Sequence, residues 1–273
     1  MPELPEVETT LRGLVPLLKG RRLETVEVRI KQLRFPFPKN FAKRLTDATV
    51  TGFSRRAKYM LLALDSDETL LVHLGMSGRL VKADPASPLN KHDHVVITTD
   101  KGVQLRYHDP RRFGFMDLFA TAARDDHKLL RDIGPEPLDA DFSPAHLQTA
   151  LRGKTAPIKN LLLDQKIVAG LGNIYVSEAL FGAGVRPTRA GGKVTKAELE
   201  RLVPAIQTVL QASIKAGGTS MRDYVQASGE MGHFQNEFAV YGREAGPCPT
   251  CETPVKRLVQ GGRASFYCPT CQR

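Results

Sequence analysis

The chain has 273 residues, of which 41% are hydrophobic, enough for one large core or two modest ones. Its 39 Lys and Arg outnumber its 29 Asp and Glu, and the net charge of +10 favours a polyanionic partner such as nucleic acid. No apolar run approaches the roughly 20 residues of a membrane span, and no basic segment leads into an apolar one at the N-terminus. We therefore expect a cytoplasmic protein with no membrane partner.

The first predicted element is a helix over residues 5–19. Pro5 suits the first turn of a helix, and Glu6 and Glu8 favour its positive end, whereas Pro16 should bend the last turn. The apolar residues recur on one helical face, at Val7, Leu11, Leu14, Val15 and Leu18. The first four residues thus lead directly into a buried helix, which would hold the N-terminus in a defined place.

Short strands follow this helix. Val26, Val28 and Ile30 alternate with charged residues, which is the period of a half-buried strand. The next apolar runs are mostly separated by Gly, Asp or Pro and read KYMLLALD, TLLVHL, HVVITT, VQLRYH and FGFMDLF. Several short strands at this spacing indicate a β-sandwich. Residues 1–130 are therefore predicted to form an N-terminal β-sandwich domain that carries the first helix.

A change of composition marks the end of this domain. The stretch 131–142 has two prolines and four acidic residues against one basic residue, and it is predicted to be a linker. Helical patterns follow in 143–237, where SPAHLQTAL begins with a Ser cap and a later helix begins with the capping-box pair Thr195 and Glu198. The polar, Gly-dotted stretch 217–237 is either a substrate-contacting loop or a disordered linker.

All four cysteines lie in a last predicted domain, 238–273. Two CPTC motifs stand sixteen residues apart, within the range of a four-cysteine zinc site, whereas a redox dithiol would explain only one of them. Four protein ligands leave no open position, so we expect one structural zinc ion bound by Cys248, Cys251, Cys268 and Cys271. The pairs flank a predicted hairpin with a Gly-Gly turn. Arg263 lies at or just after its tip, either as solvated surface or as a phosphate contact.

Two turns of the sandwich domain carry candidate DNA-contacting side chains. YHDPRRFGF has an Asp-Pro turn signal and presents Arg111 and Phe113 together, and HLGMSGRL places Met76 between glycines. An apolar side chain can enter the base stack of DNA while an arginine takes a phosphate or an orphaned base. The alternatives are a half-buried loop for Phe113 and a core filler for Met76.

A glycine-rich turn in the helical region suggests an anion site. GLGNIYVSEAL places Gly172 and Asn173 at an expected helix start, where free backbone N–H groups and the helix dipole favour negative charge. Glycine-rich turns are common, so this signal is weak by itself. Lys154 and Lys159 lie just upstream and share the basic interpretation.

The opening residues MPELPEVE could themselves do chemistry. If the initiator Met is removed, the nitrogen of Pro2 becomes a secondary amine, and an α-amino group with a pKa of roughly 8 is partly unprotonated near neutrality. Such an amine can attack an electrophilic sugar carbon and form an iminium, which has no N–H to lose and so remains an electron sink. Glu3 could deliver or take the proton. The alternative is that this segment is simply the lead-in to the helix.

Taken together, these motifs closely resemble bacterial formamidopyrimidine-DNA glycosylase. The resemblance covers essentially the whole chain in order and rests on MPELPEVET, KYM, HLGMSGRL, HDPRRFG, LLLDQKIVAGLGNIYVSEALF and RASFYCPTCQR. It implies a multidomain α+β fold with an N-terminal β-sandwich, a helix–two-turns–helix domain and a zinc finger. It also implies excision of oxidised purines, notably 8-oxoguanine and formamidopyrimidines, from double-stranded DNA by a monomer, followed by β- and δ-elimination.

The resemblance further implies a role for each matching residue. Pro2 becomes the Schiff-base nucleophile, Glu3 the proton donor, and Lys58 the acid or phosphate ligand of β-elimination. The gap left by the flipped base is filled by Met76, Arg111 and Phe113. The further DNA contacts are His92, Arg111, Lys154 and, at a phosphate site, Asn173, with Lys159 as an alternative to Lys154. Arg263 is implied as the proton donor of δ-elimination, but a guanidinium is a poor acid, and holding the 3′ phosphate is the more natural task.

Two rival interpretations remain open. An endonuclease VIII-like glycosylase for oxidised pyrimidines would share Pro2, Glu3, the helical domain and the zinc finger, although Leu4 and the RRF triplet favour the purine enzyme. A non-catalytic zinc-ribbon DNA-binding protein would explain the charge and the cysteines but not the opening residues. Strand cleavage of duplexes with 8-oxoguanine or thymine glycol separates all three.

Overall fold

The computed structural model describes residues 2–220 and 226–273 and divides the chain into two compact units. The N-terminal unit is Met1–Arg131 with Ala216–His233, and the other is Asp132–Lys215 with Phe234–Arg273. The predicted boundaries at 130, 142 and 237 stay predictions, but 216–233 belongs to the N-terminal unit rather than to the helices. The reason is physical: Lys82 N–H donates to Ala227 O at 2.9 Å, and the Thr219 N–H donates to a Glu6 carboxylate oxygen at 2.9 Å.

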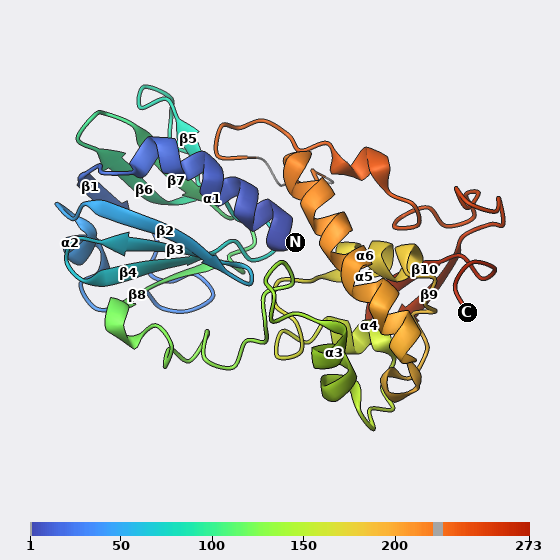
Figure 1. Cartoon of the computed structure of the whole chain (residues 1–273). Helices are drawn as coiled ribbons and strands as arrows, with labels where there is room; N and C mark the ends of the chain where they lie inside the picture. Colours follow the sequence, from blue (N-terminus) through green and yellow to red (C-terminus); the bar gives the residue numbers. More distant parts are fainter. Residues whose placement is uncertain (1, 221–225) are drawn as a thin grey trace. The chain divides into compact units, whose positions relative to one another are not determined.

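The N-terminal unit is the predicted β-sandwich, with two four-stranded sheets in the orders β1-β6-β7-β5 and β2-β3-β4-β8 (Figure 1). Every pairing within the two sheets is antiparallel. The first sheet has the strands β1 (Leu23–Val28), β5 (Arg79–Ala83), β6 (Asp93–Thr99) and β7 (Gln104–His108). The second has β2 (Val50–Arg56), β3 (Tyr59–Leu64), β4 (Glu68–His73) and β8 (Phe115–Ala120). Each of the four central strands, β3, β4, β6 and β7, has a run of buried residues.

Helix α1 (Leu4–Leu18) packs against β2 and β3 (Figure 1). Its apolar face is buried as the helical spacing predicts, with Leu4, Val7, Leu11, Leu14 and Leu18 at most 5% exposed. Burying five such side chains contributes on the order of 10 kcal/mol before the entropy of ordering the chain is subtracted. The helix continues through Pro16 and ends two residues later. The short helices α2 (Phe41–Leu45) and η1 (Thr121–Ala123) complete this unit.

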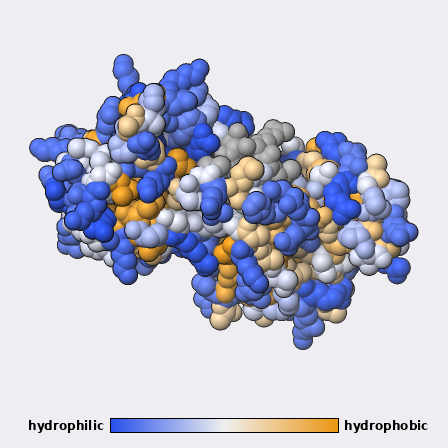
Figure 2. Space-filling model, turned by 90° about the horizontal axis from the view of Figure 1, so that it is seen from above, coloured by the Kyte–Doolittle hydropathy of each residue, from blue (hydrophilic) through white to orange (hydrophobic). Residues whose placement is uncertain are grey.

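The second unit is helical and ends in a two-stranded hairpin. Its elements are α3 (Pro144–Leu151), α4 (Ile158–Leu162), α5 (Asn173–Gly182), η2 (Gly191–Lys193), α6 (Lys196–Lys215), η3 (Phe234–Glu237), β9 (Lys256–Gln260) and β10 (Arg263–Tyr267). The predicted caps are present: Ser143 Oγ accepts the His146 N–H at 3.2 Å, and Thr195 and Glu198 form a reciprocal capping box. Hydrophilic residues predominate on the face shown in Figure 2.

Candidate active site and nucleic-acid interface

One end of the sandwich gathers the turns that carry the predicted site residues. The turn 57–58 joins β2 to β3, the turn 74–78 follows β4, and the turn 109–114 leads into β8. Antiparallel pairing aligns their flanking residues, with the registers Arg56↔Tyr59, Tyr59↔His73 and His73↔Phe115. In the other sheet, Asp93, the first residue of β6, pairs with His108, the last residue of β7. The fold therefore brings to one edge Lys58, Met76, His92, Arg111 and Phe113.

The N-terminal segment is held firmly at the start of α1. Pro2 is buried and Glu3, the N-cap residue, is 3% exposed. The Glu3 N–H donates to a carboxylate oxygen of Glu6 at 2.8 Å, and the other oxygen of Glu6 accepts the Thr219 N–H at 2.9 Å. Sequence analysis assigned Glu6 only to the helix dipole, and nothing in its local pattern points to a partner 213 residues away.

A second tie links α1 to the turn that carries Lys58. The Arg55 guanidinium donates to Glu8 of α1 and to the backbone oxygen of Ala57, each at 2.9 Å. Ala57 has a φ of 49°, so this two-residue turn adopts a left-handed conformation that a non-glycine residue rarely takes. Lys58 itself is 8% exposed. Arg55 thus fixes the turn of Lys58 relative to helix α1, which directly follows Pro2 and Glu3.

The pKa of His73 reflects the positive charge at this edge. Burial, together with the nearby cations of Lys58 and Arg34, lowers the pKa of His73 to about 4. The ring is therefore neutral near pH 7, in accord with its Nδ1, which accepts the Gly75 N–H at 3.1 Å. Lys58 and Arg34 make a further positive charge unfavourable here, and for the same reason they favour an anion such as a DNA phosphate. Sequence analysis did not single out His73 or Arg34.

Met76, Arg111 and Phe113, the residues predicted to fill the gap left by a flipped base and called the wedge below, lie on two neighbouring turns. Met76 is 36% exposed and Phe113 is 45% exposed, although both are large apolar side chains. The Arg111 guanidinium lies 4.7 Å from the centre of the Phe113 ring. Exposed apolar side chains backed by a cation suit insertion into a base stack, and this exposure argues against Met76 as a core filler. His92 is half-buried nearby, with its ring 5.8 Å from that of His108.

In the second unit, Asn173 and Arg263 lie close together. Asn173 is the first residue of α5, and its Nδ2 donates to the backbone oxygen of Ala264 at 2.9 Å. Arg263, the residue before Ala264, is exposed and opens β10 directly after the Gly261-Gly262 turn. Both glycines have a positive φ, as the predicted turn requires. The start of α5 thus contacts the residue that directly follows an exposed arginine.

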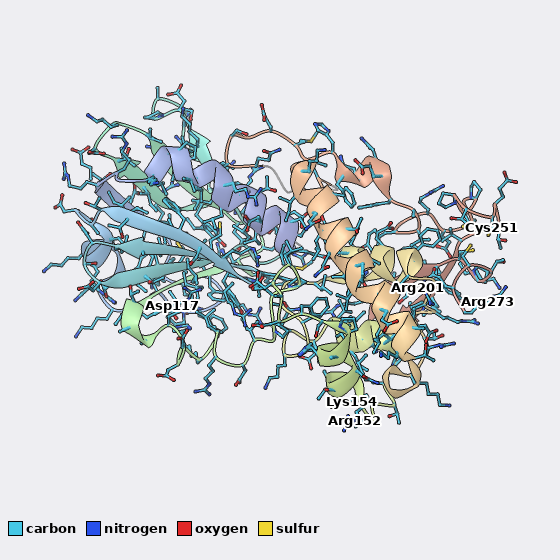
Figure 3. All side chains as sticks on the ribbon, in the orientation of Figure 1. Asp117, Arg152, Lys154, Arg201, Cys251 and Arg273 are labelled. Atoms are coloured by element: carbon cyan, nitrogen blue, oxygen red, sulfur yellow. The ribbon has the colours of Figure 1, made fainter. Side chains whose placement is uncertain are left out.

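Lys154 and Lys159 differ completely in their surroundings. Lys159 is 0% exposed, and its Nζ donates to Ala264 O at 2.7 Å and to Ser265 Oγ at 2.6 Å. An ammonium held in this way supports the strand after Arg263 and is not at the surface. Lys154 is exposed in the loop after α3, next to Arg152 (Figure 3). Of the two lysines, only Lys154 is exposed.

Glu178 is a residue of this unit that sequence analysis missed. It lies on α5 and is 7% exposed, and its carboxylate accepts three consecutive backbone N–H groups. These come from Ala239 at 2.8 Å, Val240 at 3.0 Å and Tyr241 at 2.7 Å. The Tyr241 ring in turn packs edge-on against Phe266 of β10. Glu178 therefore anchors the segment that leads from the helices into the cysteine-rich hairpin.

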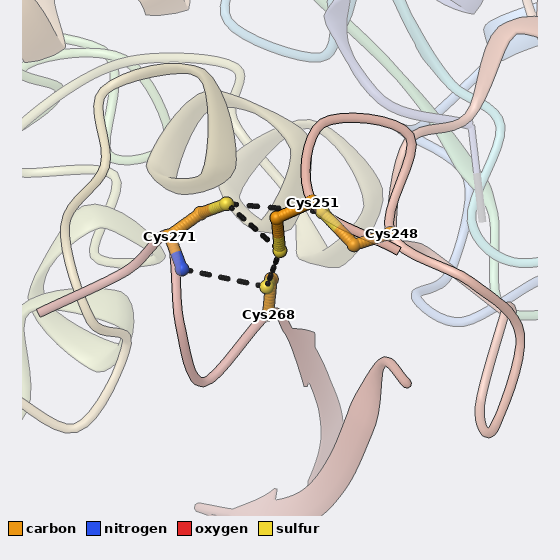
Figure 4. Close-up of side chains that lie close together, drawn as sticks. All are labelled: Cys248, Cys251, Cys268 and Cys271. Atoms are coloured by element: carbon orange, nitrogen blue, oxygen red, sulfur yellow. Dashed lines mark hydrogen bonds between the residues drawn. The ribbon is translucent and has the colours of Figure 1, made fainter. Parts of the chain in front are cut away.

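The four cysteine sulfurs converge as the two CPTC motifs predict (Figure 4). Cys251 Sγ lies 3.5 Å from the sulfur of Cys268 and 3.4 Å from that of Cys271, and Cys248 and Cys271 are 3.9 Å apart at their sulfurs. A tetrahedral ion with Zn–S bonds of roughly 2.3 Å has S–S separations of about 3.8 Å, so the site fits zinc. The chain binds one structural zinc ion here.

The electrostatics of the sulfurs agree with a cation among them. Hydrogen bonding by Thr253 lowers the pKa of the Cys251 thiol to about 6, whereas the neighbouring Cys251 sulfur raises that of Cys271 to about 12. Such splitting arises because adjacent thiolates repel each other. Zinc removes the conflict by stabilising all four thiolates.

Within 217–237, the described residues up to His233 belong to the N-terminal unit and are anchored there. Thr219 and His233 form a bridge at its base, and the Gly232 N–H donates to Ser220 Oγ at 2.8 Å. Ala227 is fully buried. The predicted substrate-contacting tip includes 221–225, which lie outside the described residues. Among the described residues, no helix has the length and apolarity required to cross a membrane.

The chain thus combines a β-sandwich with a fixed N-terminal segment, a helical unit and a four-cysteine zinc site. Models for the formamidopyrimidine-DNA glycosylase N-terminal domain, its H2TH domain and the zinc finger found in FPG and IleRS match residues 1–116, 133–225 and 246–273. The chain belongs to the formamidopyrimidine-DNA glycosylase family.

Individual relatives agree over the full length. Formamidopyrimidine-DNA glycosylases of Jannaschia sp. (strain CCS1) and Ruegeria pomeroyi are 54% and 53% identical, with 100% of both chains covered in each case. The MutM (FPG) structure of Thermus thermophilus has a TM-score of 0.89 and 39% identity, covering 99% of this chain and 98% of that one. A Lactococcus lactis FPG mutant in complex with Fapy-dG containing DNA has a TM-score of 0.93 and 36% identity, with 100% of both chains covered.

Proposed function

We propose that this chain excises oxidised purines, 8-oxoguanine and formamidopyrimidines, from double-stranded DNA and then cuts the strand by β- and δ-elimination. The family membership makes it a DNA glycosylase that acts on damaged DNA. The observation that carries the finer proposal is the burial of Pro2 and Glu3 at the sandwich edge, tied through Arg55 to the turn of Lys58. The first residues of most chains are poorly ordered, so burial of these two residues supports a chemical role for them.

The proposed reaction starts at the nitrogen of Pro2, once Met1 has been removed. Its lone pair adds to C1′ of the damaged nucleoside and the bond from C1′ to the base breaks. The bond from C1′ to O4′ then opens, O4′ leaves as a hydroxyl group, and Glu3 exchanges the protons that these steps require. The resulting iminium withdraws electrons from the sugar, so a C2′ proton becomes acidic. Loss of that proton expels the 3′ phosphate, and a second elimination expels the 5′ phosphate. Lys58 acts as the acid or phosphate ligand of the first elimination.

The remaining site residues hold the DNA in this proposal. Met76, Phe113 and Arg111 fill the gap left by the flipped base, because Met76 and Phe113 are exposed apolar side chains and Arg111 is a cation stacked on the Phe113 ring. His92, Lys154 and Asn173 contact the backbone, and Arg263 holds the 3′ phosphate rather than donating a proton. Lys159 positions β10 instead of touching DNA. We further propose that the enzyme works as a monomer in the cytoplasm, on the chromosome.

A panel of duplexes tests this function. The same strand is prepared with 8-oxoguanine, a formamidopyrimidine or thymine glycol, each opposite its normal partner, and cleavage is followed under single-turnover conditions. The proposal predicts fastest cleavage of the two purine lesions. Preference for thymine glycol would indicate an enzyme for oxidised pyrimidines, and binding without cleavage of any duplex would indicate a non-catalytic DNA-binding protein.

A further inference from the structure

Asp109 occupies the centre of the edge that carries the wedge, and the proposed mechanism does not use it. Its side chain is 0% exposed and joins two separate turns. One carboxylate oxygen accepts the Ser77 hydroxyl at 2.7 Å, and the other accepts the Gly114 N–H at 2.8 Å. Ser77 directly follows Met76, and Gly114 directly follows Phe113.

The backbone of Asp109 adds contacts to the same surface. Its carbonyl accepts the Arg112 N–H at 3.2 Å and lies 2.9 Å from His94 Nε2, and its own N–H donates to His92 O at 3.1 Å. Ser77 Oγ also accepts the Arg111 N–H at 3.3 Å. Asp109 and Ser77 thus hydrogen-bond to the backbone of His92, Arg111 and Gly114, which are predicted DNA contacts or lie next to one.

The two turns are in backbone contact at this point. A Cβ added to Gly75 would lie 2.3 Å from the Gly114 nitrogen, so this close approach is possible only with glycine at position 75. The wedge side chains themselves are exposed and have few partners to hold them. Their placement must come from the backbone beneath, and a carboxylate is suited to this task because it accepts two donors from opposite sides.

We propose that Asp109 is a positioning residue that sets the wedge of Met76, Arg111 and Phe113 before DNA binds; this inference rests on the proposed function. Side chains that are already placed lose less conformational freedom when they enter the base stack, so more of the stacking energy remains for recognition of the lesion. Asp109 does not touch the reacting sugar in this account and acts only through the wedge.

The test compares Asp109→Ala with Asp109→Asn in the full-length zinc protein. The affinity ratio between a duplex with 8-oxoguanine opposite cytosine and the undamaged duplex measures lesion recognition. Asp109→Ala leaves the buried Gly114 N–H without an acceptor, and we expect the ratio to fall about tenfold. Asp109→Asn can still accept that N–H and donate to Ser77 Oγ, so it should restore most of the ratio.

Two further measurements separate positioning from general support of the fold. A single-stranded oligonucleotide with a ready-made abasic site has no orphaned base and no stacked gap, so Asp109→Ala should cleave it within about twofold of the wild-type rate. In a Phe113→Ala background, Asp109→Ala should reduce the ratio by less than about twofold more, because the wedge is already disabled. Asp65→Ala is the matched control, since Asp65 accepts the Thr49 N–H at 2.8 Å near the opposite end of β3.

Each result has a definite meaning. Equal losses on the abasic single strand and in lesion recognition, or full additivity with Phe113→Ala, would overturn the positioning role. If the wild-type protein prefers thymine glycol, the proposed purine specificity fails by itself. The same Asp109 comparisons are then made on the thymine glycol duplex, where the same losses are expected because a gap and an orphaned base arise there too.

Discussion

Replacement of Glu178 should loosen the segment that enters the zinc finger. The carboxylate is buried and accepts the N–H groups of Ala239, Val240 and Tyr241. In Glu178→Gln the amide oxygen can keep the two bonds made by Oε1, but its NH₂ group then faces the N–H of Ala239. One lost charge-assisted bond, which leaves the half-buried Ala239 N–H without its acceptor, costs about 2 kcal/mol. Glu178→Ala leaves all three N–H groups without an acceptor, and we expect roughly 3 to 6 kcal/mol.

Native-state hydrogen exchange measures this loss directly at the three amides. A cost of about 2 kcal/mol for local opening corresponds to roughly 30-fold faster exchange. Glu200→Gln is the matched control, since Glu200 is exposed on α6 and its pair with Lys196 at 3.8 Å should contribute little. Exchange at 239–241 that is no faster in Glu178→Gln than in Glu200→Gln would refute the anchoring role.

Three other predictions concern the zinc, the phosphates and the pH response. Metal analysis should find one zinc per chain, and Cys248→Ser should lose it together with DNA affinity while the N-terminal unit keeps its thermal transition; freshly purified protein with a stoichiometry near zero would contradict the site. Arg263→Ala should reduce the slope of log affinity against log salt by about 0.9 on duplex DNA, and an unchanged slope would mean that Arg263 is only solvated. Because burial and then Lys58 and Arg34 lower the pKa of His73 from 6.5 to about 4, the unfolded chain takes up this proton first as the pH falls. The free energy of unfolding should therefore lose up to roughly 3 kcal/mol between pH 6.5 and 4, and His73→Asn, which keeps an acceptor for Gly75, should abolish this part; identical pH profiles would contradict it.

Local signals in the sequence were sufficient for several elements. Two elements depend only on neighbours within four residues: the capping box of Thr195 and Glu198 and the Gly-Gly hairpin turn. Both could therefore be predicted from the local sequence. The zinc site could also be predicted, because each CPTC motif supplies two ligands from one turn. The β-sandwich was predictable as a class from its short strands.

Long-range polar contacts were beyond such patterns. The sequence offers Lys159 as an alternative to Lys154 for a DNA contact, yet α4 turns it inward against Ala264, 105 residues further along the chain. Asp109 was interpreted as part of a turn signal, which explains the turn but not its bond to Ser77. Buried polar groups take their partners from whichever element packs beside them, so their roles depend on tertiary structure that local sequence does not specify.

The central claim is that the N-terminal nitrogen is the catalytic nucleophile, and borohydride trapping tests it most directly. Protein with Met1 removed is reacted with a duplex that contains 8-oxoguanine in the presence of borohydride, and the covalent adduct is digested and mapped. We expect the DNA to be attached at Pro2, and we expect no adduct when any residue precedes Pro2, although that protein still binds DNA. Attachment at Lys58 or another lysine, with Pro2 unmodified, would contradict the account.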